Sequence, residues 1–141
     1  MSGPSDRVDR LVEAGEELAK ADRYSEALAQ FRAAWEAMPE PKEEDDAAVG
    51  VLAAIAECCF FLGRWDGCRY AVQHAVRCGA DVANPFLRLR LGQSLYELGD
   101  VHASANWLVP VYPMEGRGPL ENDDLKYLES FRIDVIRPAG G

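Results

Sequence analysis

Apolar side chains recur every three or four residues through most of the chain, which is the spacing of one buried face of an α-helix. The pattern predicts helices at about residues 6–20 and 24–37, joined by a polar turn at residues 21–23. Pro39 ends the second helix, because proline lacks a backbone N–H. The residues expected in the seam of this first hairpin are Leu11, Gly15, Leu18, Ala27, Leu28, Phe31 and Ala34. A hairpin this short cannot bury its apolar face alone, so further hairpins should pack against it.

The same arrangement of small and large apolar residues returns twice. Val72 lies 41 residues after Phe31, and Leu108 lies 36 residues after Val72, at matching points of the pattern. The sequence therefore predicts three hairpins, at about residues 6–38, 46–78 and 85–112. Glycine turns are expected at residues 63–64 and 99–100, and the Asn84-Pro85 pair is typical of a helix start.

Two stretches indicate a known repeat. They are the Leu91-Gly92 pair and the run Tyr24, Ala27, Phe31, Ala34, Pro39. This pattern resembles the tetratricopeptide repeat, over about residues 8–117. The resemblance implies an all-α fold of antiparallel helical hairpins stacked as a short right-handed solenoid. Since the family repeat is about 34 residues long, the longer spacings here predict longer links between hairpins.

The sequence outside the hairpins predicts a capping helix and two terminal segments without regular structure. Residues 121–133 carry apolar side chains on one face and acids on others, which suits the terminal capping helix of a solenoid. We expect a disordered lead at residues 1–5, a single domain at 6–133 and a loose tail at 134–141. The linker at residues 39–46 has a composition that is too charged and proline-rich to pack. The helix after it, at about 46–62, is apolar on nearly all sides and should be flanked by helices.

Charge and composition narrow the classes of partner. The 141-residue chain has a formal net charge of −9, which disfavours nucleic acid and favours a basic protein partner. No apolar run is long enough to span a membrane, and no signal peptide is visible, so a cytoplasmic location is expected.

The residue types that carry chemistry do not form a recognisable site. Cys58 and Cys59 are adjacent, so on a helix their side chains diverge by about 100° and chelate a metal poorly together. Cys68 and Cys78 complete the set without any C-x-x-C pair, and buried thiols are the better interpretation. No triad, phosphate loop or metal-ligand pair is present in the sequence. We therefore predict no catalytic residue, cofactor or metal, and a protein that is not an enzyme.

The resemblance implies that the first helix of each hairpin lines a groove. The residues expected there are Glu16, Lys20, Glu57, Phe60, Phe61, Phe86, Leu89, Gln93, Tyr96 and Glu97. Members of the family that grip a terminal carboxylate use Lys and Asn, where this chain has Glu16, Glu57 and Gln93. The mixture of aromatic and acidic residues instead suits a basic, partly apolar protein. For Phe60, Phe61 and Phe86, packing between repeats is an equal alternative.

These observations favour a non-enzymatic protein-binding module. Within that class, one hypothesis is a cognate immunity protein that neutralises a toxin, and its rival is a chaperone for a secreted protein. A different class, a self-associating structural scaffold, stays open.

Overall fold

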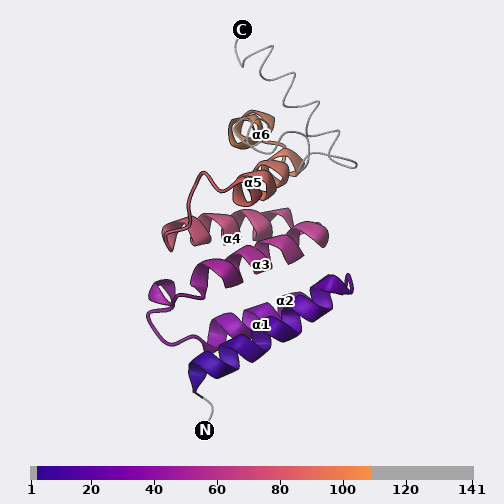
Figure 1. Cartoon of the computed structure of the whole chain (residues 1–141). Helices are drawn as coiled ribbons and strands as arrows, with labels where there is room; N and C mark the ends of the chain where they lie inside the picture. The colour runs from indigo at the N-terminus through magenta and orange to yellow at the C-terminus, as the bar shows by residue number, and fades with distance from the viewer. Residues whose placement is uncertain (1–2, 109–141) are drawn as a thin grey trace. The chain divides into compact units, whose positions relative to one another are not determined.

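The computed structural model describes residues 3–108, and these residues form helices and no strand (Figure 1). This confirms the all-α prediction. The elements are α1 (Pro4–Lys20), α2 (Tyr24–Ala37), the short 3₁₀ helix η1 (Lys42–Glu44), α3 (Ala48–Phe61), α4 (Trp65–Arg77), α5 (Pro85–Glu97) and α6 (Val101–Leu108). The predicted capping helix at 121–133, the tail at 134–141 and the end of the third hairpin lie outside the described residues.

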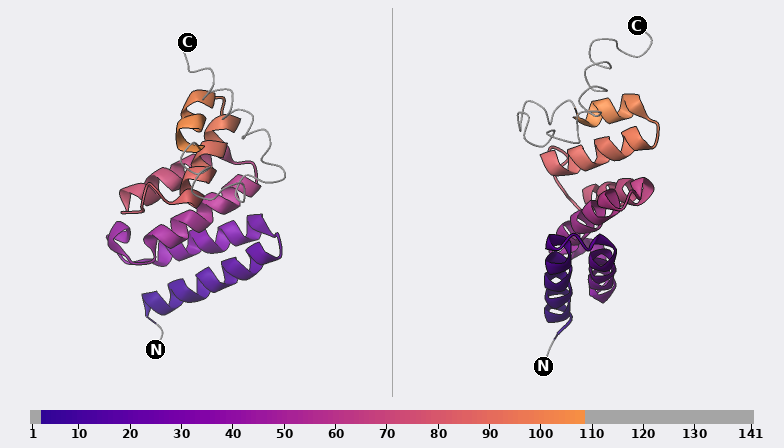
Figure 2. Two further views of the ribbon diagram at one scale, coloured as in Figure 1. Left: turned by 45° about the horizontal axis from the view of Figure 1, so that its top comes forward. Right: turned by 90° about the vertical axis from the view of Figure 1, so that its right-hand side faces the viewer.

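Consecutive helices pack as antiparallel pairs, α1 with α2, α3 with α4, and α5 with α6 (Figure 2). The chain divides into two compact units between Ala80 and Asp81. Unit 1 contains α1–α4, and the described part of unit 2 contains α5 and α6. Within unit 1, α3 packs against both α2 and α4, as its apolar sequence predicted. The organisation of residues 6–133 as one domain stays a prediction.

The three hairpins share one kind of turn. The second residue after each first helix adopts a left-handed backbone, with φ of 60° at Asp22, 71° at Gly63 and 93° at Gly99. The next N–H then donates to a carbonyl five residues back, which is the Schellman arrangement that satisfies helix-terminal carbonyls. These bonds are Arg23 to Leu18 (2.9 Å), Arg64 to Cys59 (2.8 Å) and Asp100 to Leu95 (2.9 Å).

A glycine allows close helix approach in the first and third hairpins. A Cβ on Gly15 would lie 2.7 Å from the Phe31 ring, and a Cβ on Gly92 would lie 2.6 Å from Leu108. The large side chain therefore packs directly on the backbone of the facing helix. The matching residues of the middle hairpin are Ala56 and Val72, and each is 1% exposed. The seam thus repeats at the register predicted from the sequence.

Polar bonds at the N-terminal end and in the middle of α5 hold the described part of unit 2 together. The Oδ1 atom of Asn84 accepts from the N–H groups of Phe86 (2.9 Å) and Leu87 (3.2 Å), which confirms the predicted cap. The guanidinium of Arg88 donates to the backbone carbonyls of Asn106 (3.0 Å) and Trp107 (3.1 Å) in α6. The buried Ser104 hydroxyl donates to the Gly92 carbonyl at 2.6 Å, which joins the two helices at their closest approach.

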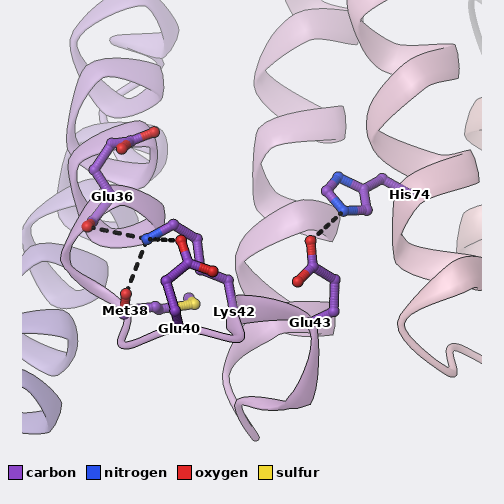
Figure 3. A network of polar contacts seen from close by, with 6 residues as sticks. All are labelled: Glu36, Met38, Glu40, Lys42, Glu43 and His74. Carbon is purple, nitrogen blue, oxygen red and sulfur yellow. Dashed lines mark hydrogen bonds and ion pairs between the residues drawn. The ribbon is translucent and has the colours of Figure 1, made fainter.

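Most residues of the linker between the first two hairpins are exposed, but two of its charged side chains have partners, which the composition did not predict. The Lys42 side chain is only 15% exposed, and its ammonium donates to the backbone carbonyls of Met38 (2.9 Å) and Glu36 (3.3 Å) (Figure 3). Glu36 is in the last turn of α2 and Met38 is its C-cap, where backbone carbonyls have no partner within the helix. Glu43 lies 3.5 Å from His74 Nε2 on α4. Lys42 and Glu43 therefore attach the linker to the end of α2 and to α4.

Candidate functional site

A cleft of about 420 Å³ opens in unit 1 between α1, the start of α2, and α3. This volume is within the usual range for sites that bind a small ligand or a side chain. We name it the α1–α3 cleft, and its lining residues are Glu16, Ala19, Lys20, Tyr24, Phe31, Ala54, Glu57, Cys58 and Phe61. Four of these, Glu16, Lys20, Glu57 and Phe61, belong to the groove predicted from the sequence. The structure brings them together in one place.

An aromatic stack forms one wall of the cleft. The rings of Tyr24 and Phe61 lie with centroids 4.7 Å apart and planes 17° from parallel. Phe61 is 48% exposed, so a large apolar surface faces solvent there. Phe60 makes edge-to-face contacts with Phe61 (5.4 Å) and Trp65 (5.5 Å) and does not line the cleft. Of these two phenylalanines, Phe61 therefore lines the cleft and Phe60 supports it.

Negative charge surrounds the hydroxyl end of the Tyr24 ring. The Tyr24 hydroxyl donates to Asp22 Oδ1 at 3.1 Å. Burial raises the pKa of Tyr24 first, and the bond to Asp22, the Asp22 charge and the Glu57 charge raise it further. The ammonium of Lys20, the one cation of the lining, lies 3.3 Å from Glu17 on the outer surface of α1. The field at the cleft is therefore set by carboxylates.

The thiol in the cleft is a buried structural group. Cys58 is 1% exposed, and burial, followed by the neighbouring Cys59 and Glu57, raises its pKa to about 11. Since the thiolate is the form that attacks electrophiles and binds metals, little of the reactive form exists near neutral pH. Cys59 and Cys68 are buried as well, which agrees with the predicted role of these thiols as small apolar groups.

The remaining predicted groove residues are in unit 2, and the structure gives them different environments. Phe86 is 64% exposed, whereas Leu89 is 3% exposed and Gln93 is fully buried. The Oε1 atom of Gln93 accepts a bond from the Arg90 guanidinium at 2.8 Å. Tyr96 and Glu97 are half-buried. Leu89 and Gln93 are thus packed groups rather than an open surface.

The groove predicted from the sequence does not include Tyr24, although Tyr24 is part of the repeat pattern. Tyr24 is the first residue of α2, and side chains in a helix tilt toward its N-terminus. A large residue there covers the preceding turn and the mouth of the hairpin. That geometric rule, applied to the predicted start at residue 24, would have placed the ring at the cleft.

A second cavity of unit 1, of about 320 Å³, was also missed. It lies among α2, α3 and α4, and its lining residues are Arg32, Trp35, Glu36, Leu52, Ile55, Cys59, Gly67, Tyr70, Ala71 and His74. His74 makes edge contacts with Trp35 (5.1 Å) and Tyr70 (5.9 Å). Its rim carries charges of both signs, on Arg32 and Glu36. The α1–α3 cleft, with Glu16 and Glu57 against Lys20, therefore has the more negative lining of the two cavities.

No model of a known protein family matches the chain, and comparison with curated proteins gives no significant match. Membership of the tetratricopeptide family accordingly stays a prediction from the residues. None of the helices in residues 3–108 has both the length and the apolar character that crossing a bilayer requires. In the same residues, no group of three or more histidine, cysteine or acidic side chains is placed to hold a metal ion.

Proposed function

We propose that this chain is a protein-binding module and that the α1–α3 cleft receives a basic, partly apolar part of its partner. The observation that carries the proposal is the exposed Tyr24–Phe61 stack, which shares one cleft with the carboxylates of Glu16 and Glu57. Covering exposed aromatic surface with a partner removes it from water, which favours association. The carboxylates beside the aromatic wall favour a positively charged group on the partner.

The two kinds of side chain have separate roles in this proposal. Aromatic anchors buried on association supply most of the binding free energy of an interface. Carboxylates act over a longer range, and the net charge of −9 attracts a basic partner before contact. Binding of this kind needs no cofactor, metal or catalytic residue.

The biological class of the partner is a further proposal. A toxin neutralised by this chain as its immunity protein, or a secreted protein held by it as a chaperone, would each supply a basic surface. A self-associating scaffold is less well supported, because a second copy would bring the same negative charge to the acidic cleft. Each hypothesis places the chain in the cytoplasm.

The test compares proteins captured from the native host by three forms of the chain. These are the wild type, a cleft variant (Glu16→Lys with Glu57→Lys) and a control variant (Glu13→Lys with Glu44→Lys). Both variants change the net charge equally, and the control residues are exposed and do not line the cleft. A protein bound by the wild type and the control but lost from the cleft variant is the expected result. Its affinity should fall most at low salt, where charge is least screened.

Phe61→Ala tests the aromatic part of the same site. It should weaken the captured complex with little dependence on salt, because it removes an apolar contact and leaves the charges unchanged. Thermal unfolding should be measured for every variant, since a folded variant is needed for the comparison. Retention of the partner by the folded cleft variant would refute the proposed site.

A further inference from the structure

Resting on the proposed function, we infer that the α1–α3 cleft is selective for an arginine side chain of the partner, over lysine and over neutral side chains. The inference concerns which basic group enters the cleft. It follows from three features of the lining: an aromatic face, carboxylates on two helices, and an apolar floor.

The aromatic face favours a cation that can lie flat. The Tyr24 and Phe61 rings are nearly parallel, at 17°, and Phe61 is 48% exposed. A planar guanidinium stacks on such a surface and gains both a cation–π interaction and dispersion contact. A lysine ammonium gains only the first of these.

The carboxylates reach the cleft from two different helices. Glu16 belongs to α1 and Glu57 to α3, and both line the cleft. A guanidinium carries five donors in a rigid fork, so one group can serve acceptors on both sides of it. An ammonium has three donors but no planar fork, so it serves two separated carboxylates with less geometric specificity.

The apolar floor of the cleft can contact the methylene groups of an arginine side chain. Ala19, Phe31 and Ala54 present apolar atoms, and the Cys58 thiol is buried among them. Three methylene groups can lie along this surface while the charged head stays near the carboxylates. Guanidinium is also less strongly hydrated than ammonium, so it loses less on entering a cleft with an apolar lining.

The second cavity of unit 1 provides an internal contrast. It also has exposed aromatic surface, since Tyr70 is 63% exposed, but Arg32 lies on its rim. There, the one carboxylate of the lining, Glu36, is matched by the Arg32 guanidinium, whereas the α1–α3 cleft has two carboxylates against the single ammonium of Lys20. The inference is therefore specific to the α1–α3 cleft.

The probe is the capped peptide acetyl-Ala-Leu-Arg-Leu-Ala-amide, titrated into the full ¹⁵N-labelled chain and followed by amide chemical shifts. Matched peptides replace Arg with Lys, citrulline or norleucine. Citrulline retains the planar shape without the charge. We expect the Arg peptide to bind about threefold tighter than the Lys peptide. It should bind about tenfold tighter than the citrulline peptide. The largest shifts should come from residues of the cleft.

Two variants test the cause of the preference. Glu16→Gln with Glu57→Gln should abolish the difference between the Arg and citrulline peptides, and Tyr24→Leu should reduce the difference between Arg and Lys. Glu13→Gln, which lies on α1 outside the cleft, should change neither. Equal affinity for the Arg and Lys peptides, or shifts centred on another surface, would overturn the inference.

Failure of this inference is distinguishable from failure of the proposed function. If the cleft variant releases the captured partner but the cleft shows no preference for the Arg peptide, the binding function stands and the inference falls. If the Arg preference is found but the cleft variant still captures the partner, the proposed function is refuted and the selectivity of the cleft stands.

Discussion

In the α1–α2 hairpin, the residue after the close-approach glycine is Glu16, which is exposed and lines a cleft. In the α5–α6 hairpin, the residue after the matching glycine is Gln93, which is fully buried and bonded to Arg90. The contacts on the other side of the two glycines are equivalent, because Phe31 and Leu108 each pack against a helix backbone. The seam positions are thus constrained by helix packing, whereas the neighbouring positions are free to become either surface or core.

The largest expected loss of stability comes from truncating the large side chain in each of the two seams. Phe31→Ala should lower the free energy of unfolding of unit 1 by about 3–5 kcal/mol, and Leu108→Ala should lower that of unit 2 by about 2–5 kcal/mol. Both side chains are at most 2% exposed, so each change leaves a cavity. Urea unfolding measured by tryptophan fluorescence checks this, with the exposed Ser25→Ala as a control. A loss below about 1 kcal/mol for either variant would show that its seam is not a shared structural element.

A smaller effect should make the stability of unit 1, which contains Cys58 on α3, depend on pH. The folded-state pKa of Cys58, about 11, is above its ordinary value of 9.0. The thiol therefore contributes constant stability below pH 9, and this contribution is lost as the pH rises toward 11. The loss should be on the order of 2 kcal/mol. Urea unfolding at pH 8, 9, 10 and 11 should show a shallower decline for Cys58→Ala. The raised pKa values of Cys59, Cys78 and Tyr24 leave part of the slope in place.

If Cys58→Ala and the wild type lose stability equally between pH 9 and 11, the burial assigned to this thiol is incorrect. Cys78→Ala is the matched control, because Cys78 is only half-buried and lies outside the cleft. It should leave most of the alkaline decline unchanged.

The smallest expected effect is the difference in stability between Gly15→Ala and Gly92→Ala. Gly92→Ala should cost more than Gly15→Ala, because its Cβ would meet the Ser104 backbone carbonyl at 3.2 Å as well as Leu108. For the Cβ of Gly15→Ala, the three nearest atoms all belong to the Phe31 ring, a side chain rather than backbone. Overpacking costs about 1–3 kcal/mol, and the better helix propensity of alanine offsets about 1 kcal/mol of this. Thermal unfolding of each variant measures the difference.

A double-mutant cycle sharpens that result. Phe31→Leu removes the ring atoms that the new methyl group would meet, so Gly15→Ala should be less costly in that background. Additive effects of the two changes would contradict the packing of Phe31 on Gly15.

The helices, their turns and the seam were predictable because each depends on local spacing. The period of apolar residues identifies the buried face, and Gly63, Gly99 and Asn84 have backbone or capping preferences that do not depend on the rest of the fold. Four cleft residues were found because the first helices of consecutive hairpins share a face.

What the sequence did not predict depends on contacts between distant residues. The stack of Tyr24 on Phe61 joins residues 37 positions apart, and no periodic pattern records it. The burial of Leu89 and Gln93 depends on what surrounds α5 rather than on its own sequence. The linker was judged by its charge, but Lys42 and Glu43 are partnered by α2 carbonyls and His74. Composition cannot show that a charge has a partner.

The environment of Lys42 has a practical consequence for the chemistry of the protein's amines. Its ammonium is bonded to two carbonyls and is 15% exposed, whereas the Lys20 side chain is 72% exposed. An acylating reagent should therefore modify Lys20 readily and Lys42 slowly, since reaction needs an accessible nitrogen with a free lone pair. Because Lys20 lines the α1–α3 cleft, a sensor surface coupled through that amine would obstruct the cleft. Attachment that spares amines keeps the cleft open to ligands.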